Sequence, residues 1–268
     1  MEVNNWLKVA SKELSAAGIS SAQLDALILA EDQLGKDRAY LLAHPEIKLS
    51  EAQTKSLDRK LKRRLKHEPL AYIRGFCEFY GRRFKINKRV LEPRPESETM
   101  IELLKKLPLQ AHPIMADVGT GSGAIGITAK LEIPTCEVDL YDIDSSCLAV
   151  ARHNCALHEL HLPGFKRDLL NRAARAYDIV LANLPYVPNR WKINEAAAME
   201  PRIAIFGGPD GLDLYRRLFE QLSKMSIQPK FVLAESLPPQ HEALQKIAQN
   251  YGYKLKTTED FIQVFALN

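Results

Sequence analysis

The sequence of 268 residues has only four cysteines, and their spacing fits neither a disulfide framework nor a zinc site. They form no Cys-x-x-Cys pair and no cluster with histidine, so we expect reduced core thiols and no metal site. They are Cys77, Cys136, Cys147 and Cys155. Apolar runs are also short, and none approaches the ~18 uncharged residues that a membrane-spanning helix needs. The N-terminus lacks the basic residues followed by an apolar run that are typical of a secretory signal. We therefore expect a cytoplasmic protein with no membrane partner.

The net charge of +4 is small, but it is unevenly distributed along the chain. The segment from Lys55 to Arg94 holds 14 Lys or Arg residues against 4 Asp or Glu residues. Such a segment predicts an acidic partner and proximity to RNA. It is equally typical of a solvated helix face, since Leu57, Leu61 and Leu65 recur at helical spacing within it. The charge pattern alone leaves both interpretations open.

The pattern of the first ~70 residues predicts four short amphipathic helices. Helices of this length form a bundle that is too small to be an enzyme by itself. The fourth begins with a capping box between Ser50 and Gln53 and is ended by Pro69. The next segment, 76–86, alternates around Gly81 and predicts a β-hairpin. We therefore expect a helical domain at 1–74, a hairpin and linker at 75–95, and a second, larger domain at 96–268.

From Ile114 onward, predicted strands alternate with predicted helices, which is typical of an α/β fold. We expect a doubly wound, mostly parallel seven-stranded sheet with helices on both faces and its last two strands antiparallel. The strands are expected at 114–118, 137–141, 165–167, 177–182, 230–234, 253–257 and 261–266, and the helices at 96–107, 124–131, 145–158, 212–225 and 240–251.

A glycine-rich loop follows the first of these strands, in the sequence Asp-Val-Gly-Thr-Gly-Ser-Gly from Asp117 to Gly123. Glycines at such a turn let a ligand approach the backbone without meeting a Cβ atom. Asp142 lies 19 residues after Gly123, at the end of the next strand, where a carboxylate accepts from ribose hydroxyls. Asp144 is the competing acidic residue. The pattern fits both a nicotinamide dinucleotide and S-adenosylmethionine.

A second motif, Asn183-Leu184-Pro185-Tyr186, directly follows an apolar strand and indicates which chemistry the loop serves. In an open parallel sheet, ligands bind beyond the carboxyl ends of the strands. The Asn183 side chain and the Leu184 backbone offer two carbonyl acceptors for the N–H groups of a weakly nucleophilic amide or amino nitrogen. Pro185 holds Leu184 extended, and Tyr186 offers a flat face for a planar acceptor. The motif thus predicts methyl transfer to nitrogen, driven by positioning and water exclusion.

Together the two motifs resemble those of class I amino-nitrogen methyltransferases, which have a Rossmann-like sheet and use S-adenosylmethionine. Within that class the chain is similar to the bacterial release factor glutamine methyltransferases, the HemK/PrmC family. Three further segments carry the likeness along nearly the whole chain: 67–81, the Leu-Glu-Pro-Arg-Pro-Glu-Ser-Glu loop at 91–98, and 200–211.

The resemblance implies a role for each domain, a substrate, a cofactor and a set of site residues. The helical domain at 1–74 is expected to recognise the substrate, and 96–268 is expected to be the S-adenosylmethionine-dependent methyltransferase domain. The substrate is the glutamine in the Gly-Gly-Gln motif of class I peptide-chain release factors, and the methyl donor is S-adenosylmethionine. Cofactor contacts are expected from Asp117, Gly119, Thr120, Gly121, Ser122, Gly123, Asp142, Asp168, Leu169 and Asn183. Catalysis and substrate binding are expected from Asn183, Leu184, Pro185 and Tyr186, with Arg94 as a further substrate contact.

The chain departs from the family pattern at several positions. Leu184 replaces the usual proline of the tetrapeptide, and Leu169 replaces an aromatic residue. Glu235-Ser236-Leu237 stands where Glu-x-Gly is expected. Two other functions stay open: an adenine amino-methyltransferase acting on RNA or DNA, and a catalytically silent module that binds release factors. A nicotinamide-dependent dehydrogenase is disfavoured because no His or Lys stands where a hydride-transfer acid is expected.

Overall fold

The computed structural model describes residues 1–173 and 175–268, and these divide into two units. One unit comprises Met1–Gly75 together with Asn194–Met199, and the other comprises Phe76–Ile193 and Glu200–Asn268. All four cysteines are buried, as expected. No helix in the described part of the chain is long and apolar enough to cross a membrane.

The smaller unit is a bundle of short helices around the buried side chains of Trp6, Leu14 and Leu29. Its helices are α1 (Val3–Ala16), α2 (Ala22–Leu34), α3 (Arg38–Ala43), α4 (Glu51–Arg64) and α5 (Leu70–Arg74). The predicted capping box is confirmed at the start of α4, where the Gln53 amide donates to Ser50 Oγ at 3.2 Å. Helix α5 is not predicted by the sequence pattern. It has only five residues, which is too short to show a helical period, and Gly75 ends it with a φ of +81°.

The larger unit begins with the predicted hairpin, β1 (Phe76–Phe79) and β2 (Arg82–Lys85), which pair antiparallel. A seven-stranded sheet follows in the order β5-β4-β3-β6-β7-β9-β8. The five strands from β5 to β7 are parallel, and β9 and β8 are antiparallel, which confirms the predicted fold class. The sheet strands are β3 (Ile114–Val118), β4 (Glu137–Asp142), β5 (Gly164–Lys166), β6 (Ile179–Ala182), β7 (Phe231–Glu235), β8 (Tyr253–Glu259) and β9 (Ile262–Leu267).

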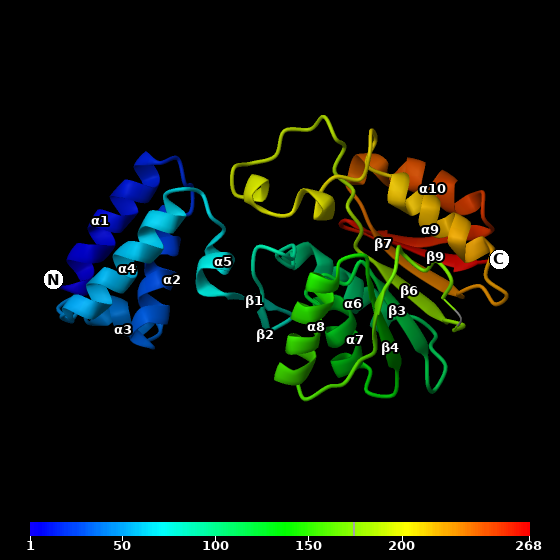
Figure 1. The fold of residues 1–268 in the computed structure, drawn as a ribbon, viewed down its shortest axis with the longest axis horizontal. Coiled ribbons are helices and arrows are strands. Elements are labelled where there is room, and N and C mark those ends of the chain that lie inside the picture. The colour runs from blue at the N-terminus through cyan, green and yellow to red at the C-terminus, as the bar shows by residue number, and fades with distance from the viewer. Residues whose placement is uncertain (174) are drawn as a thin grey trace. The chain divides into compact units, whose positions relative to one another are not determined.

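Helices cover both faces of this sheet, as expected for a doubly wound fold. Helices α6, α7 and α8 lie on one face, and α9 and α10 lie on the other (Figure 1). The helices are α6 (Glu98–Lys105), α7 (Ala124–Glu132), α8 (Ser145–Leu157), α9 (Asp213–Ser223) and α10 (His241–Gln249), with short 3-10 turns η1 (Pro95–Ser97), η3 (Arg202–Ala204) and η4 (Pro238–Gln240). A further 3-10 turn, η2 (Ala197–Met199), belongs to the smaller unit.

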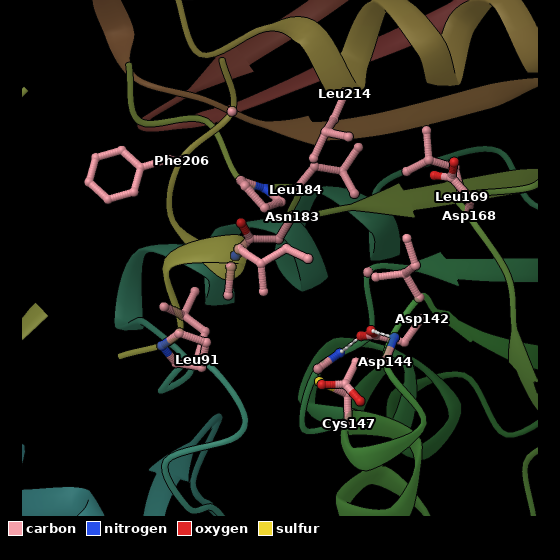
Figure 2. Close-up of a pocket in the computed structure, with 18 of the residues that line it drawn as sticks. Leu91, Asp142, Asp144, Cys147, Asp168, Leu169, Asn183, Leu184, Phe206 and Leu214 are labelled. Carbon is pink, nitrogen blue, oxygen red and sulfur yellow. Dashed lines mark hydrogen bonds between the residues drawn. The ribbon is translucent and has the colours of Figure 1, made fainter. Parts of the chain in front are cut away.

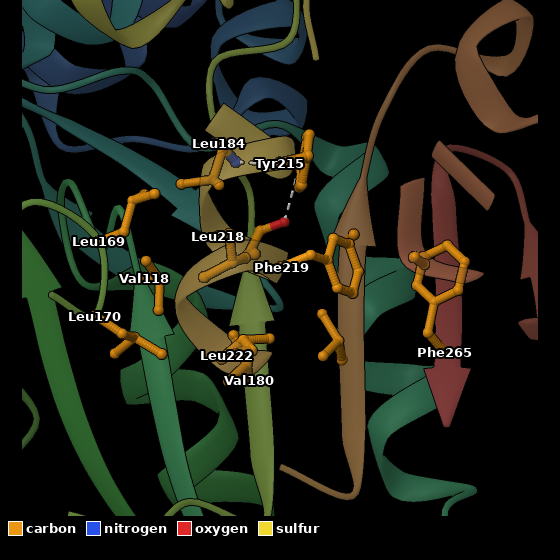
Figure 3. Close-up of a cluster of buried hydrophobic side chains, with 14 of the residues drawn as sticks. Val118, Leu169, Leu170, Val180, Leu184, Tyr215, Leu218, Phe219, Leu222 and Phe265 are labelled. Carbon is orange, nitrogen blue, oxygen red and sulfur yellow. Dashed lines mark hydrogen bonds between the residues drawn. The ribbon is translucent and has the colours of Figure 1, made fainter. Parts of the chain in front are cut away.

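Leucines and aromatic residues of α9 form the core on one side of the sheet. Leu218, Phe219 and Leu222 are fully buried against strand residues such as Val180 and Phe265 (Figure 3). Burying each such side chain contributes about 1.5–3 kcal/mol. Because β6 and β7 are central strands, this core holds the carboxyl ends of both strands in place, where the predicted functional residues lie.

A fully buried asparagine on α8 connects the hairpin to the glycine loop. Asn154 Nδ2 donates to the Lys85 carbonyl at 2.9 Å and to the Ser122 carbonyl at 2.8 Å. Its Oδ1 accepts from the Lys85 amide at 2.8 Å. Buried amide groups need such partners because leaving one unpaired costs about 1–3 kcal/mol. The hairpin is therefore an integral part of the unit that carries the glycine loop.

Candidate active site

The glycine loop leaves β3 and folds over the end of β4. The amides of Gly119 and Thr120 both donate to the Tyr141 carbonyl at 2.9 Å. Gly119, Gly121 and Gly123 have φ angles of +74°, +54° and +83°, a region that side chains rarely adopt. The chain then enters α7 directly after Gly123. The glycines are thus required by the turn itself, and they leave its backbone open to a ligand.

Asp117 supports this loop from within the protein. Its Oδ2 accepts from Thr120 Oγ1 at 2.6 Å and from the Gly126 amide at 2.9 Å. The side chain is 1% exposed, and burial raises its pKa to about 6 despite these two hydrogen bonds. Asp117 therefore acts on the loop geometry, and its carboxylate is already engaged.

The raised pKa of Asp117 predicts a specific pH dependence of stability. The folded state binds this proton more tightly than the unfolded chain, whose aspartates titrate near ~3.9. The stabilisation linked to Asp117 is therefore fully present below about pH 4 and is lost as the pH rises to about 6. We expect the free energy of unfolding of the wild type, relative to Asp117→Asn, to decrease across this interval in urea titrations. The exposed Asp260→Asn controls for the loss of one carboxylate, and a constant difference between pH 4 and 6 would contradict the prediction.

Asp142 ends β4 with both carboxylate oxygens on backbone amides. Oδ2 accepts from Gly121 and Oδ1 accepts from Asp144, each at 2.9 Å. Burial raises the pKa of Asp142, and these two amides act in the opposite direction. Asp144 caps α8 by accepting from the Ser146 amide at 2.8 Å. Each Asp142 oxygen keeps a second lone pair, so the carboxylate can accept from a ligand while it shapes the loop.

The tetrapeptide after β6 is held by a tyrosine of α9. The Leu184 amide donates to Tyr215 Oη at 3.3 Å, and that hydroxyl lies 3.1 Å from the Ala182 carbonyl and close to the Glu235 carbonyl. Tyr215 is fully buried, so this hydroxyl joins the ends of β6 and β7 in a fixed arrangement (Figure 3). On the other side of the turn, Gln240 Nε2 donates to the Tyr186 carbonyl at 2.8 Å.

A buried carboxylate at the end of β7 accepts hydrogen bonds from two hydroxyl groups. Glu235 is 1% exposed and accepts from Ser97 Oγ at 2.6 Å and from Tyr186 Oη at 3.0 Å. Asn183 Nδ2 in turn donates to Ser97 Oγ at 2.9 Å. Burial raises the pKa of Glu235 and that of Tyr186, whose phenol the nearby carboxylate also keeps protonated. Tyr186 is thus held as a hydrogen-bond donor and does not serve as a base.

These elements surround a cavity of about 380 Å³ (Figure 2). Eight of the residues predicted from the sequence line it: Gly119, Gly121, Asp142, Asp168, Leu169, Asn183, Leu184 and Pro185. Figure 2 shows Asp142 and Asp144 on one side of the cavity, and Asn183 and Leu184 on another. The two sequence motifs, more than 60 residues apart, therefore meet at one site. Thr120 and Ser122 line an adjoining hollow of about 50 Å³ together with Asn183 and Ser97.

Four predicted residues are not among the described residues that line either cavity: Asp117, Gly123, Arg94 and Tyr186. Arg94 forms an ion pair with Glu200, which is 4% exposed, and lies 3.8 Å from Glu92 Oε2. The cofactor and substrate contacts of all these residues stay predictions. Within the described part of the chain, no group of three or more His, Cys, Asp and Glu side chains is arranged to hold a metal ion.

Leu169 lies in the cavity wall with a φ of +55°, which disfavours a branched side chain. Gln221 of α9 supports this conformation, because its Oε1 accepts from the Leu170 amide at 2.9 Å and its Nε2 donates to the Asp168 carbonyl at 3.4 Å. The Asp168 side chain pairs with Arg217. The turn after β5 is therefore fixed by α9, which explains how a leucine is presented there.

Several residues that line the cavity were not predicted from the sequence. They are Arg89, Leu91, Ile143, Cys147, Arg167, Pro201, Ile203, Ala204, Phe206, Gly207, Gly208, Asp213, Leu214 and Arg217. Half of them lie in the two segments 91–98 and 200–211, which the resemblance had singled out without assigning a role to these residues. Phe206 is one of these, and it stands at one edge of the cavity (Figure 2). The other residues lie in loops and on helices where no local signal marked them.

Comparison with known proteins relates both units to methyltransferases. Residues 5–75 match the family described as the PrmC N-terminal domain, and residues 97–200 match the methyltransferase small domain. The "Release factor glutamine methyltransferase" of Coxiella burnetii is 34% identical over 257 residues, which cover 95% of this chain and 92% of that protein. The protein of the same description from Koribacter versatilis is 38% identical over 80% of this chain and 78% of that protein.

Other relatives and solved structures extend the comparison. The "Bifunctional methyltransferase" of Rickettsia bellii is 30% identical over 97% of this chain, which spans only 53% of that protein. A methyltransferase from Pyrococcus furiosus aligns with a TM-score of 0.53 at 15% identity, over 78% of this chain and 98% of that one. The catalytic domain of hMettl16 aligns with a TM-score of 0.57 at 13% identity, over 87% and 92% of the two chains. At these identities the solved structures show the shared fold alone.

Proposed function

Because the chain belongs to the family of the release factor glutamine methyltransferases, we propose that it methylates a glutamine side chain of peptide-chain release factors. The methyl donor is S-adenosylmethionine, and the acceptor is the amide nitrogen of the glutamine in the Gly-Gly-Gln motif of class I release factors. The observation that carries this proposal is that Asn183, Leu184 and Pro185 line the same cavity as Gly121 and Asp142.

The cavity fits such a cofactor in size and in chemistry. Its volume of about 380 Å³ is within the range of ~300–1,000 Å³ for small-molecule sites. The backbone at Gly119 and Gly121 lacks side chains, and a Cβ at Gly119 would come within 3.0 Å of Leu184 Cδ2. Asp142 can accept from ribose hydroxyls. When bound, S-adenosylmethionine supplies an activated methyl group.

The tetrapeptide supplies the positioning that a poor nucleophile needs. Asn183 Oδ1 and the Leu184 carbonyl accept the two N–H groups of the substrate amide, which orients its nitrogen toward the donor. Pro185 disfavours the α region at Leu184 and so keeps that carbonyl extended. The hydrogen bond from Tyr186 to Glu235 fixes the tyrosine ring as a flat contact for the amide. No strong general base is needed, because the nitrogen loses its proton as it becomes cationic.

The helical unit has a separate role in this proposal. Residues 1–74 bind the release factor away from its glutamine, which supplies binding energy that the small amide cannot provide. The predicted RNA proximity of the segment from Lys55 to Arg94 has no support from the comparisons and stays a prediction. Its positive charge is the reason to include RNA in the test below.

A methylation assay with two acceptors tests the proposal. The chain is incubated with labelled S-adenosylmethionine and either a class I release factor or bulk ribosomal RNA. We expect label on the release factor, located by mass spectrometry on the Gly-Gly-Gln peptide, and no label when that glutamine is replaced by alanine. Label on RNA alone would favour the adenine amino-methyltransferase. Cofactor binding without transfer to either acceptor would favour the silent binding module.

A further inference from the structure

The structure assigns a positioning role to Ser97 and Glu235: they fix which end of the Asn183 carboxamide faces the substrate. This inference rests on the proposed function, because it concerns how the acceptor amide is held. Neither residue was predicted as part of the site from the sequence. Both are 1% exposed, and Ser97 lies 86 residues before Asn183 in the chain.

The sheet brings the carboxylate and the carboxamide together. Strands β6 and β7 are parallel neighbours, with Ala182 opposite Ala234, so Asn183 and Glu235 follow at adjacent strand ends. Ser97 ends the η1 turn and lies between them, with Oγ at 2.6 Å from Glu235 Oε2 and at 2.9 Å from Asn183 Nδ2. The hydrogen bonds thus run from Asn183 through Ser97 to Glu235.

The number of available protons determines the direction of these hydrogen bonds. Both oxygens of Glu235 act as acceptors: Ser97 Oγ donates to Oε2, and Tyr186 Oη donates to Oε1. A serine has one hydroxyl proton, and once it is given to Glu235, Ser97 Oγ can only accept from its other neighbour. The Asn183 group that faces Ser97 is therefore the NH₂ group, and Oδ1 is left for another donor.

The same count of hydroxyl protons disfavours the reversed orientation of the Asn183 carboxamide, in which its oxygen and nitrogen exchange places. It would put Oδ1 against Ser97 Oγ, so that two acceptors would face each other in a buried place without a proton between them. It would also present an NH₂ group to a substrate amide whose N–H groups need acceptors. This hydrogen-bond network, whose members Ser97 and Glu235 are buried behind the tetrapeptide, selects the one orientation that suits methyl transfer to nitrogen.

Three variants test this inference through kinetics. Ser97→Ala removes the acceptor and is expected to lower kcat about 10- to 100-fold, since small misplacements at a reacting group have effects of this size. The affinity for S-adenosylmethionine, measured by calorimetry, should change less than about twofold. Ser97→Thr keeps the hydroxyl and should recover most of kcat. Thr99→Ala removes a hydroxyl two residues away, which donates to Asp260 at 3.2 Å, and should leave kcat unchanged.

A second measurement does not depend on activity. The side-chain NH₂ signal of Asn183, assigned by its loss in Asn183→Ala, should exchange slowly with water in the wild type and clearly faster in Ser97→Ala and Glu235→Gln. An inactive wild type with a protected NH₂ signal would overturn the proposed substrate and leave the positioning role supported. Unchanged kcat and exchange in Ser97→Ala, or a loss of cofactor affinity in parallel with kcat, would overturn the positioning role.

Discussion

Asn183→Ala is expected to lower kcat for glutamine methylation by about 10²- to 10³-fold, the effect typical of removing one preorganised polar group from an active site. The variant loses the side-chain carbonyl that we propose as an acceptor for the substrate amide. It keeps the Leu184 carbonyl, the glycine loop and Asp142, so cofactor affinity should fall far less than kcat. Initial rates at saturating release factor, combined with calorimetric titration of S-adenosylmethionine, separate the two effects.

The exposed Asn250 offers a matched control, because Asn250→Ala removes the same side chain at the end of α10. Its kcat should stay within about twofold of the wild type. Retention of near-wild-type kcat in Asn183→Ala would refute the role of the tetrapeptide. A matched loss of stability in Asn183→Ala, seen in thermal unfolding, would instead indicate that the side chain is mainly structural.

Gly207→Ala is expected to damage both stability and catalysis, because Gly207 lies directly against the backbone of the tetrapeptide. A Cβ atom at this position would lie 2.2 Å from the Pro185 carbonyl oxygen and 2.5 Å from that of Gly211. The Gly207 amide also donates to the Val187 carbonyl at 3.0 Å, so the two segments cannot separate without losing a hydrogen bond. We expect a loss of about 1–3 kcal/mol in the free energy of unfolding and at least a tenfold loss in kcat.

Gly164→Ala is the matched control for this substitution. A Cβ there would meet only Leu148 Cδ2, at 3.5 Å, an ordinary van der Waals distance. Its free energy of unfolding should therefore stay within about 0.5 kcal/mol of the wild type, and its kcat should not change. If the two variants had the same free energy of unfolding and the same kcat, the close approach of the added Cβ to the Pro185 carbonyl oxygen would be shown to cost nothing.

The alternation of strands and helices was readable from the sequence because it rests on local periodicity. The ends of the elements were predicted less accurately where a side chain takes the place of a backbone group in the hydrogen bonds of the sheet. The strand predicted to begin at Tyr177 begins at Ile179, because the Asp178 carboxylate accepts from the Ile114 amide at 2.7 Å. The strand order was not predictable either, since it depends on packing between segments that are far apart in the chain.

The same limit applies to the active site. The glycine loop and the tetrapeptide are continuous motifs, and the sequence brought both to attention together with Asp142. The contact between Ser97 and Glu235 joins residues 138 positions apart, and no local pattern signals it. The sequence marked Glu235 only as part of a departure from a family motif, although a glutamate directly after a buried apolar strand needs a partner.

Through its hydrogen bonds, Asn154 makes the conformation of the glycine loop depend on the hairpin. A shortened chain that begins at residue 96 would lack Lys85, so Asn154 would lose two of its three hydrogen bonds and keep only the one to the Ser122 carbonyl. We infer that an autonomous catalytic fragment has to start no later than Phe76. Substitutions in the hairpin, although remote from the reacting atoms, should then change the affinity for S-adenosylmethionine.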